Sequence, residues 1–412
     1  MGLRCDPIPT VRIGVVGLNR GGAAVYRLAR IEGTRIVSIS DLIPKRIARA
    51  QKNLKDAGHP EALVYSGKDD WKKMCERDDI DLIYNATPWE LHVPIALYAM
   101  EHGKHVAVEV PAALTVDDCW ALVDTAEKTQ RHCMMLENCC YDFFEMATLN
   151  MARNDIFGKV YHGECAYIHD LKKAKFGSLK WRLGYSKKHT GNPYPTHGLG
   201  PVAQIMGINR GDRFDYLTSM STSQIGLSLY AENAFGKHSP QAKTAYKLGD
   251  MNTTLVRTFN GHTFMIQHDT TSPRPYDRIH KLVGTKGYAT KYPEKKIALE
   301  PKSHDFLKPD EFRKLMTNYE HPLAKHIGKQ AKAVGGHGGM DYIMDWRLIY
   351  CLRNGLPLDQ DVYDAATWSC IVELSEQSVL NRSNAVEIPD FTRGDWINAK
   401  PWPVIDMINV LS

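Results

Sequence analysis

Two side chains capable of proton transfer lie three residues apart in the stretch GNPYPTHGLGP, residues 191–201. The phenol of Tyr194 and the imidazole of His197 are separated there by Pro195 and Thr196. Enzymes use both groups as general acids and bases. Glycine and proline are also common turn residues, so the pattern is equally that of an ordinary tight loop. The stretch therefore predicts a restrained loop that either presents catalytic groups or only turns the chain.

The element best placed to support such chemistry is a nucleotide-binding unit at the start of the chain. Residues 11–18 form an apolar, β-branched run typical of a buried parallel strand, and residues 19–33 then follow helical spacing. A second strand, 36–41, ends in Asp41 about 20 residues after the glycine turn. This order predicts a Rossmann unit that binds pyrophosphate at the turn and ribose at Asp41. Because a carboxylate repels a 2′-phosphate, NAD is the expected cofactor.

The glycine turn departs from the usual G-x-G-x-x-G pattern at one position. Its sequence, residues 17–22, is GLNRGG, so Asn19 stands at the second glycine position. Asparagine tolerates left-handed backbone better than other residues that carry a side chain, so the turn can still form. Asn19 and Arg20 are therefore predicted to contact the cofactor.

Strand and helix patterns continue to alternate up to about residue 145. The predicted strands are 81–87, 105–111 and 132–140, and the predicted helices are 92–103 and 115–129, the latter with Thr115 as its N-cap. The pattern predicts a six-stranded, doubly wound parallel sheet, which binds ligands at the carboxyl ends of its strands. The further cofactor contacts predicted at this edge are Trp89, His92, Glu109, Val110 and Asn138.

The second half of the chain has a different pattern. Alternating runs predict strands at 159–170, 214–222, 252–270 (a hairpin around Asn260-Gly261) and 279–292 (a strand pair), followed by helices at 340–355 and 361–380. These patterns predict an α+β domain on an open, largely antiparallel sheet. We expect a Rossmann domain at 1–145 and a substrate and oligomerisation domain at 146–412. The C-terminal helices and tail are expected to pack back on the first domain, and the two domains to share one cleft.

Composition excludes several classes of protein. Hydrophobic residues make up 43% and charged residues 24%, as in soluble globular proteins. The net charge of +5, from 52 basic and 47 acidic residues, is too small and too dispersed to predict a nucleic-acid or membrane-surface partner. The nine cysteines follow neither a disulfide framework nor zinc-site spacing, so no metal is predicted.

No apolar run reaches the ~20 residues of a membrane-spanning helix, and residues 1–10 contain no signal-peptide core. We therefore expect no membrane span. The protein is expected either in the cytoplasm or exported, in which case a signal has already been removed.

Several motifs together resemble the Gfo/Idh/MocA family of NAD(P)-dependent sugar and cyclitol oxidoreductases. They are the ATP-x-x-x-H run ending at His92, the strand HGKHVAVEVP and the hairpin LVGTKG. The chain departs from that family at its proton-handling residues. Val110 stands where the dehydrogenases carry the lysine of E-K-P, and Thr196 and Gly200 stand where they carry an aspartate and a histidine.

A more specific resemblance accounts for these departures. The set N-R-G-G, W-x-x-H, E-V-P, E-N, Y-P-T-H and the late H-G-G-M-D, residues 337–341, is similar to glycoside hydrolase family 109. Its members are NAD-dependent glycosidases typified by α-N-acetylgalactosaminidase. The resemblance implies that tightly bound NAD⁺ oxidises the sugar at C3, which allows elimination across C1 and C2. Water then adds at C1, and the retained NADH returns its hydride, so NAD is recycled.

The expected substrate is a terminal amino-sugar glycoside, here N-acetylgalactosamine. His197 is predicted as general acid/base with Tyr194 as its partner, and which of the two is the base stays open. Arg182 is predicted to supply the cation that a reactive phenol needs and to clamp the substrate. The resemblance adds Tyr167, Pro195, Thr196 and Tyr276 as substrate contacts. The alternatives are a sugar dehydrogenase and a non-catalytic sugar or NAD sensor. By resemblance to the family, a homo-oligomer, most simply a dimer, is expected to form through the open sheet.

Overall fold

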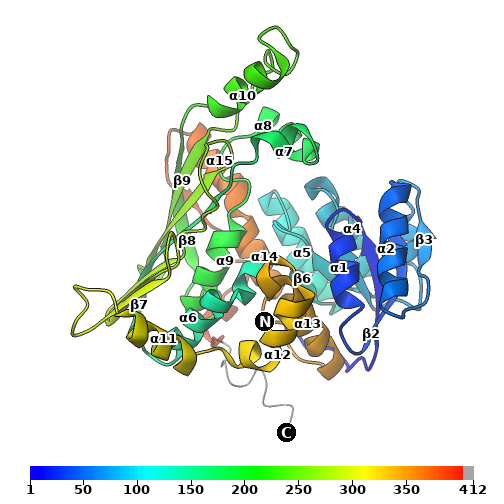
Figure 1. The fold of residues 1–412 in the computed structure, drawn as a ribbon, viewed down its shortest axis with the longest axis horizontal. Coiled ribbons are helices and arrows are strands. Elements are labelled where there is room, and N and C mark those ends of the chain that lie inside the picture. Colours follow the sequence, from blue (N-terminus) through cyan, green and yellow to red (C-terminus); the bar gives the residue numbers. More distant parts are fainter. Residues whose placement is uncertain (402–412) are drawn as a thin grey trace. The chain divides into compact units, whose positions relative to one another are not determined.

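The computed structural model describes residues 1–401. By internal contacts these residues form two units, each with its own sheet (Figure 1). The first unit comprises residues 1–146 and 320–369, and the second comprises residues 147–319 and 370–401. The end of the tail whose packing was predicted, residues 402–412, lies outside the described residues.

The first unit is built on a six-stranded sheet in the order β3-β2-β1-β4-β5-β6, and every strand pair in it is parallel. Its strands are β1 (Val11–Val16), β2 (Thr34–Ser40), β3 (Leu63–Tyr65), β4 (Leu82–Asn85), β5 (His105–Val108) and β6 (Cys133–Met135). The order reverses between β1 and β4, which is the position where doubly wound sheets bind dinucleotides. The predicted Rossmann sheet is confirmed.

Helices cover both faces of this sheet, because right-handed connections place α1 and α2 on one face and α4 and α5 on the other. The helices of the first unit are α1 (Gly21–Leu28), α2 (Pro44–Asp56), α3 (Trp71–Cys75), α4 (His92–Glu101), α5 (Val116–Thr129), α12 (Pro322–Val334), α13 (Met340–Asn354) and α14 (Val362–Ser369). Thr115 caps α5 as predicted, since its Oγ1 accepts from the Asp118 N–H at 3.1 Å. The helix α13 is buried along most of its length and contacts α1.

The second unit is built on an eight-stranded open sheet in the order β13-β12-β11-β7-β10-β9-β8-β14. Its strands are β7 (Val160–Ile168), β8 (Phe214–Ser221), β9 (Met251–Thr258), β10 (Thr263–Asp269), β11 (Lys281–Gly284), β12 (Gly287–Thr290), β13 (Lys296–Leu299) and β14 (Val386–Glu387). All pairs are antiparallel except β7 with β10. The predicted largely antiparallel sheet is confirmed, including the hairpin at Asn260-Gly261 and the β11–β12 pair.

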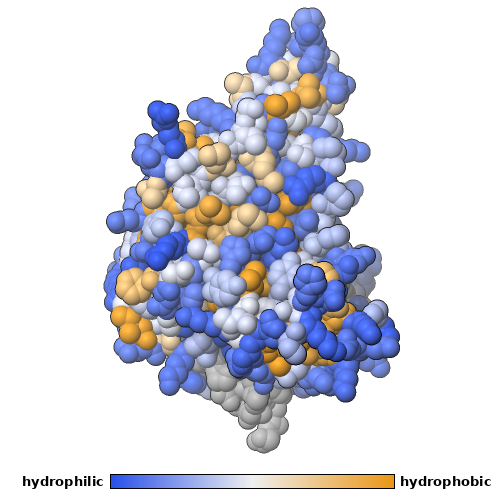
Figure 2. All heavy atoms as spheres, turned by 90° about the vertical axis from the view of Figure 1, so that its left-hand side faces the viewer, coloured by the Kyte–Doolittle hydropathy of each residue, from blue (hydrophilic) through white to orange (hydrophobic). Residues whose placement is uncertain are grey.

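One face of the second sheet is covered by helices, because α9 packs on β7 and α15 packs on β8. The helices of this unit are α6 (Phe143–Arg153, which begins in the first unit), α7 (Lys172–Phe176), α8 (Lys180–Lys188), α9 (Thr196–Ile205), α10 (Gly226–Phe235), α11 (Pro309–Asn318) and α15 (Ile371–Leu380). The other face exposes apolar side chains, among them Tyr216 and Leu255, between polar ones (Figure 2).

One predicted helix is wrong in its extent. The stretch 361–380 forms two helices, α14 and α15, which are interrupted at Cys370. The interruption coincides with the boundary between the two units, so the two halves of one apolar pattern bury themselves in different cores. Helical spacing alone does not reveal such a division. Within residues 1–401, no helix has the length and apolar character needed to cross a membrane.

Candidate functional site

Only the first part of residues 191–201, which contain Tyr194 and His197, is a loop. Thr196 begins α9, with Pro195 as its N-cap, so the prediction of a loop through residue 201 is wrong. At position 198 the packing of the helix requires a glycine. A Cβ on Gly198 would lie 2.4 Å from the Ala166 backbone nitrogen, so the helix can approach β7 this closely only with glycine. The glycine therefore reflects close packing rather than a turn.

Tyr194 and His197 contact each other directly. The Tyr194 hydroxyl lies 3.3 Å from His197 Nε2, and both side chains are more than nine-tenths buried. The proline before α9 and the first turn of the helix hold the two side chains on one side of the chain. The pair can therefore pass a proton between phenol and imidazole, with the donor set by the histidine tautomer.

Aromatic side chains from β7, from β10 and from the segments that follow these two strands surround this pair. We call the set the aromatic cluster; its members are Tyr167, His169, Tyr194, His197, His268 and Tyr276. Tyr167 on β7 and His268 on β10 are direct register partners, so they face the same side of the sheet. The Tyr167 and Tyr194 rings lie 4.6 Å apart between centroids. Tyr276 is the exposed member of the cluster, whereas Tyr167 and His268 are buried. The cluster therefore has one side open to solvent and one side inside the protein.

A guanidinium lies over the Tyr194 phenol. The Arg182 Cζ atom on α8 is 4.4 Å from the centroid of the Tyr194 ring and 4.9 Å from that of Trp181. A cation in this position is attracted to the ring and stabilises negative charge on the phenol oxygen. The structure thus brings together five of the predicted catalytic and substrate-binding residues: Tyr167, Arg182, Tyr194, His197 and Tyr276.

The remaining two predicted contacts, Pro195 and Thr196, are fully buried beside the pair. The hydroxyl of Thr196 and the side-chain nitrogen Nδ2 of Asn192 are both buried and find no hydrogen-bond partner within residues 1–401. Buried polar groups are rarely left unpaired in folded proteins, because each costs roughly 1–3 kcal/mol. Two such groups close to Tyr194 and His197 in the chain are therefore consistent with a binding site for a polar ligand.

Three nitrogen bases near Arg182 were not predicted from the sequence. Burial, followed by the Arg182 charge, lowers the pKa of His169, whose Nδ1 lies 3.3 Å from the Tyr167 hydroxyl. Burial also lowers the pKa of His268, together with the charges of Lys175 and Arg182. Lys175 itself is 2% exposed, and burial and Arg182 lower its pKa to about 7. Burial and the positive charge of Arg182 therefore favour the uncharged form of all three bases.

The cofactor edge of the first unit begins at the glycine turn. Asp41, at the end of β2, accepts from the Leu18 N–H at 2.7 Å and from the Ile43 N–H at 2.8 Å. A carboxylate has about four acceptor positions, so capacity remains for ribose hydroxyls. A Cβ on Gly17 would lie 2.6 Å from the Ala86 carbonyl oxygen, so the turn sits directly on the strand that follows the topological switch. These features fit a dinucleotide.

Replacing Asp41 by alanine is expected to weaken NAD⁺ binding about 10- to 100-fold, because the ribose loses a charged hydrogen-bond acceptor. Titration calorimetry of the purified variant measures the change. NADP⁺ affinity should rise relative to NAD⁺ affinity, since the charge that repels a 2′-phosphate is gone. Asp56→Ala removes the same charge from an exposed position at the end of α2 and serves as the control. Equal NAD⁺ affinities for both variants would contradict the assignment.

Trp89, His92 and Val110 shape the loops after β4 and β5. The Trp89 indole N–H donates to the Val110 carbonyl at 3.1 Å. The His92 nitrogens contact the carbonyls of Pro111 and Thr87 at 2.8 and 2.9 Å. Burial lowers the pKa of His92, and the single N–H of a neutral ring can donate to only one of these two carbonyls. His92 and Trp89 therefore fix the backbone of the cofactor edge from within.

A second set of contacts at this edge involves Arg20, Glu109 after β5 and Asn138 after β6. Arg20 Nε lies 3.1 Å from Glu109 Oε1, and the Asn138 side-chain amide donates to Asp341 Oδ1 at 2.5 Å. Asp341 is at the start of α13, where sequence reasoning placed only a motif. Burial alone would raise the pKa of Asp341, but the hydrogen bond from His337 and the charges of Arg27 and Arg20 hold it well below its usual range.

His337 is a second imidazole in a suitable position for proton transfer. Its Nδ1 lies 2.9 Å from Asp341 Oδ2, and the side chain is half exposed. Residues 335–339, GGHGG, all have positive φ, so the histidine is on a loop that few other sequences could form. A buried carboxylate that orients an exposed histidine is a common catalytic arrangement. The sequence offered the glycines as a signal, but not the carboxylate partner.

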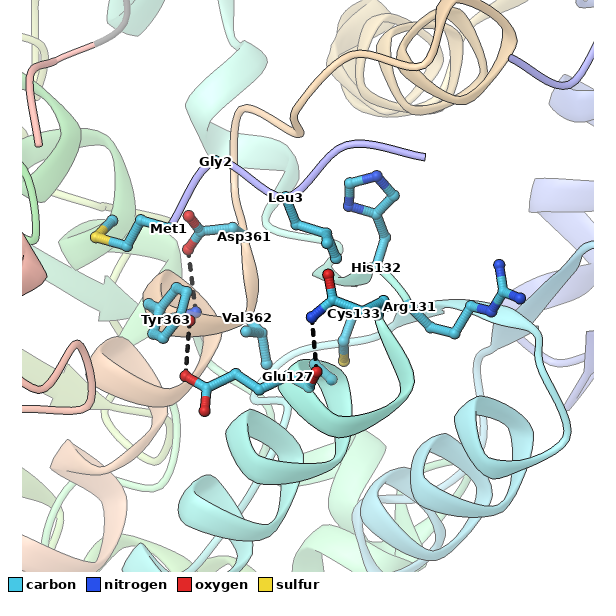
Figure 3. Close-up of a pocket in the computed structure, with 12 residues that line it drawn as sticks. Met1, Gly2, Leu3, Glu127, Arg131, His132, Cys133, Asp361, Val362 and Tyr363 are labelled. Atoms are coloured by element: carbon cyan, nitrogen blue, oxygen red, sulfur yellow. Dashed lines mark hydrogen bonds between the residues drawn. The ribbon is translucent and has the colours of Figure 1, made fainter. Parts of the chain in front are cut away.

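A separate cavity of about 170 Å³ lies in the first unit, at the amino end of β6 (Figure 3). Its lining includes Glu127, His132 and Tyr363, and the Tyr363 hydroxyl donates to Glu127 at 2.8 Å. Ligands of doubly wound sheets bind at the opposite, carboxyl ends of the strands. This cavity is therefore not the cofactor site.

Comparison with protein families divides the chain in two. Residues 11–137 match the oxidoreductase family with an NAD-binding Rossmann fold, and residues 141–398 match the C-terminal domain of glycosyl hydrolase 109. An α-N-acetylgalactosaminidase from Bacteroides fragilis is 54% identical over 96% of this chain and 95% of its own. A glycosyl hydrolase family 109 protein from Phocaeicola vulgatus is 53% identical over 96% of this chain and 98% of its own.

Solved structures of dehydrogenases share the fold. Levoglucosan dehydrogenase in complex with NADH and levoglucosan has a TM-score of 0.69 at 18% identity, over 92% of this chain and all of its own. The scyllo-inositol dehydrogenase from Lactobacillus casei, with bound NAD(H) and scyllo-inositol, has a TM-score of 0.65 at 14% identity, over 92% of this chain and 99% of its own. At these identities the likeness shows the fold alone.

Proposed function

This chain belongs to glycosyl hydrolase family 109, and from that premise we propose that it removes terminal N-acetylgalactosamine from glycoconjugates. The relative from Bacteroides fragilis named as an α-N-acetylgalactosaminidase supports the substrate, and the NAD-binding Rossmann fold supports the cofactor. The observation that carries the proposal is the Tyr194–His197 contact under Arg182. The pair is chemically able to transfer a proton, whereas Val110, which stands at the position of the dehydrogenases' lysine in the sequence, is not.

NAD, when bound, accepts hydride from the sugar C3 and returns it later in the same turnover. The side chains of the protein must then carry out the proton transfers. A base must take the proton of the C3 hydroxyl and the C2 hydrogen, and an acid must protonate the glycosidic oxygen as the C1 bond breaks. The Tyr194–His197 pair supports the base function, with Arg182 stabilising the phenolate. His337 offers a second acid or base of independent geometry.

Substrate binding is proposed for the rest of the aromatic cluster. Tyr167 and Tyr276 offer ring faces and hydroxyls to a sugar, while Thr196 and Asn192 offer buried polar atoms without partners in the described residues. Retention of the cofactor between turnovers also belongs to the proposal, because a recycled dinucleotide gains nothing from exchange. The open face of the second sheet is proposed as the homodimer interface, supported by its exposed Tyr216 and Leu255.

The test follows two products from one substrate. Incubation of the purified protein with a nitrophenyl α-N-acetylgalactosaminide is expected to release nitrophenol without accumulation of NADH absorbance. Added NAD⁺ should change the rate little if the cofactor is retained. NADH that accumulates in step with substrate consumption would instead identify a sugar dehydrogenase. Binding of sugar and NAD without either signal, and without solvent deuterium exchange at C2, would identify a sensor.

A further inference from the structure

Five charged side chains of the first unit form one connected group at the cofactor edge. We call it the carboxylate network; its members are Arg20, Arg27, Glu109, Asp341 and Asp345. Three of them are carboxylates and two are guanidinium groups, so the network carries more negative than positive charge when all are ionised. Such an imbalance is costly inside a protein unless something compensates it.

The buried half of the network is centred on Arg27. Its Nε lies 2.7 Å from Asp345 Oδ2, and its Nη1 lies 3.4 Å from Asp341 Oδ2. All three side chains are at most 5% exposed. The two aspartates are one turn apart on α13, so a single guanidinium serves two carboxylates. The Tyr84 hydroxyl adds one uncharged hydrogen bond to Asp345 at 3.0 Å.

The other half of the network, which contains Arg20 and Glu109, lies at the carboxyl ends of the strands. Arg20, at the glycine turn, lies 3.1 Å from Glu109 and 4.0 Å from Asp341. Glu109 directly follows β5, and Asn138, which donates to Asp341, follows β6. These strands belong to the half of a doubly wound sheet that does not hold the adenosine ribose acid Asp41. The end of the network that contains Glu109 and Asp341 therefore lies in the half of the unit where the nicotinamide is expected.

The negative charges persist at the pH of the proposed reaction. Burial raises the pKa of Asp345 to about 6 against the opposing charge of Arg27, so the group is ionised at about pH 8. His337 hydrogen-bonds Asp341 and is the nearest titratable group on the same segment.

We propose that the carboxylate network biases the recycled cofactor toward its oxidised form. The oxidised nicotinamide ring carries one positive charge and the reduced ring carries none, so surplus buried negative charge stabilises NAD⁺ relative to NADH. The inference rests on the proposed function, because only a recycled cofactor must return to NAD⁺ in every turnover. Asp345 acts through the field rather than by contact and is a positioning residue.

The test is a ratio of dissociation constants measured on the full-length protein. Calorimetric titrations of the full-length protein, first freed of its retained cofactor, with NAD⁺ and with NADH at about pH 8 give Kd(NAD⁺)/Kd(NADH). Asp345→Asn is expected to raise this ratio about fivefold, which corresponds to a rise of about 20 mV in the potential of the bound couple. Tyr84→Phe removes the hydrogen bond to Asp345 but no charge, so its ratio should equal that of the parent protein.

Glu109→Gln is the second variant and serves if Asp345→Asn does not fold, because Glu109 is less buried and pairs only with Arg20 among the network's cations. Its ratio should also rise. An unchanged ratio in the folded variants, or equal weakening of both cofactor forms, would overturn the inference. Protein that binds neither form would refute the proposed function instead, so the two failures are distinguishable.

Discussion

Replacing His197 by glutamine is expected to lower kcat for a nitrophenyl α-N-acetylgalactosaminide about 10²- to 10⁴-fold, with a smaller effect on KM. Glutamine keeps a polar group near the Tyr194 hydroxyl but cannot exchange a proton, and positioned proton transfer contributes rate factors of about that size. Initial rates over a substrate series measure kcat and KM separately. Cofactor content, read from the absorbance of the protein, should stay unchanged.

His238→Gln is the matched control, because it makes the same substitution at an exposed position of the second unit. His337→Gln tests the other imidazole, which Asp341 orients. If His197→Gln retains parental turnover while His337→Gln loses it, the acid/base role moves to His337. If both variants lose turnover, the two histidines divide the acid and base steps between them.

Sequence patterns predicted those parts of the molecule that depend on local spacing. The distance from the glycine turn to Asp41 is fixed by the length of one helix and one strand, so the placement of this carboxylate beside the turn could be predicted without a structure. Tyr194 and His197 are three residues apart, and their side chains contact each other in the observed structure, where α9 begins between them. Their contact is therefore present although the predicted local conformation was wrong, and their catalytic role stays a prediction.

Local patterns failed where packing decides the conformation. Gly198 and Pro201 indicate a loop by their types, yet they lie in a helix because α9 must touch the backbone of β7. Glycine at a close helix–strand contact and glycine in a turn look identical in a sequence. The same limit applies to the helix interrupted at Cys370, since the boundary between two cores leaves no mark on an apolar pattern.

Contacts between distant segments were beyond the reach of the sequence. Arg27 and Asp345 are 318 residues apart in the chain and form one buried ion pair. Two aspartates four residues apart in the otherwise apolar start of α13 were the available signal, because buried carboxylates require a cation. Lys175 gave no signal, since the run KKAKF is typical of a solvated surface.

Replacing Lys175 by methionine is expected to stabilise the protein by roughly 2–5 kcal/mol at about pH 6. Lys175 donates only to Ser186 Oγ, across 3.4 Å, and no carboxylate pairs with it within residues 1–401. Its pKa falls from 10.5 to about 7 on folding, because burial and Arg182 disfavour the charge. Between these values the unfolded chain holds a proton that the folded chain does not, so stability rises with pH.

Below about pH 7 the folded protein therefore carries the full cost of a buried ammonium, and methionine removes that cost while conserving the volume. The gain should shrink toward about pH 10, as the lysine becomes neutral in both states. Urea denaturation at several pH values measures it, with Lys173→Met, an exposed lysine on the same helix, as control. A constant gain across the pH range, or a loss at about pH 6, would show that Lys175 is stably paired.

A buried lysine with a lowered pKa is also a candidate for a functional role in its site. Lys175 lies close enough to Arg182 and His268 to shift His268 by its charge, and Arg182 lies over the Tyr194 phenol. Its protonation therefore alters the field at the reactive pair near neutral pH. The methionine variant is expected to be more stable but slower, and to lose from its pH–rate profile an ionisation near pH 7 that the Lys173→Met control keeps.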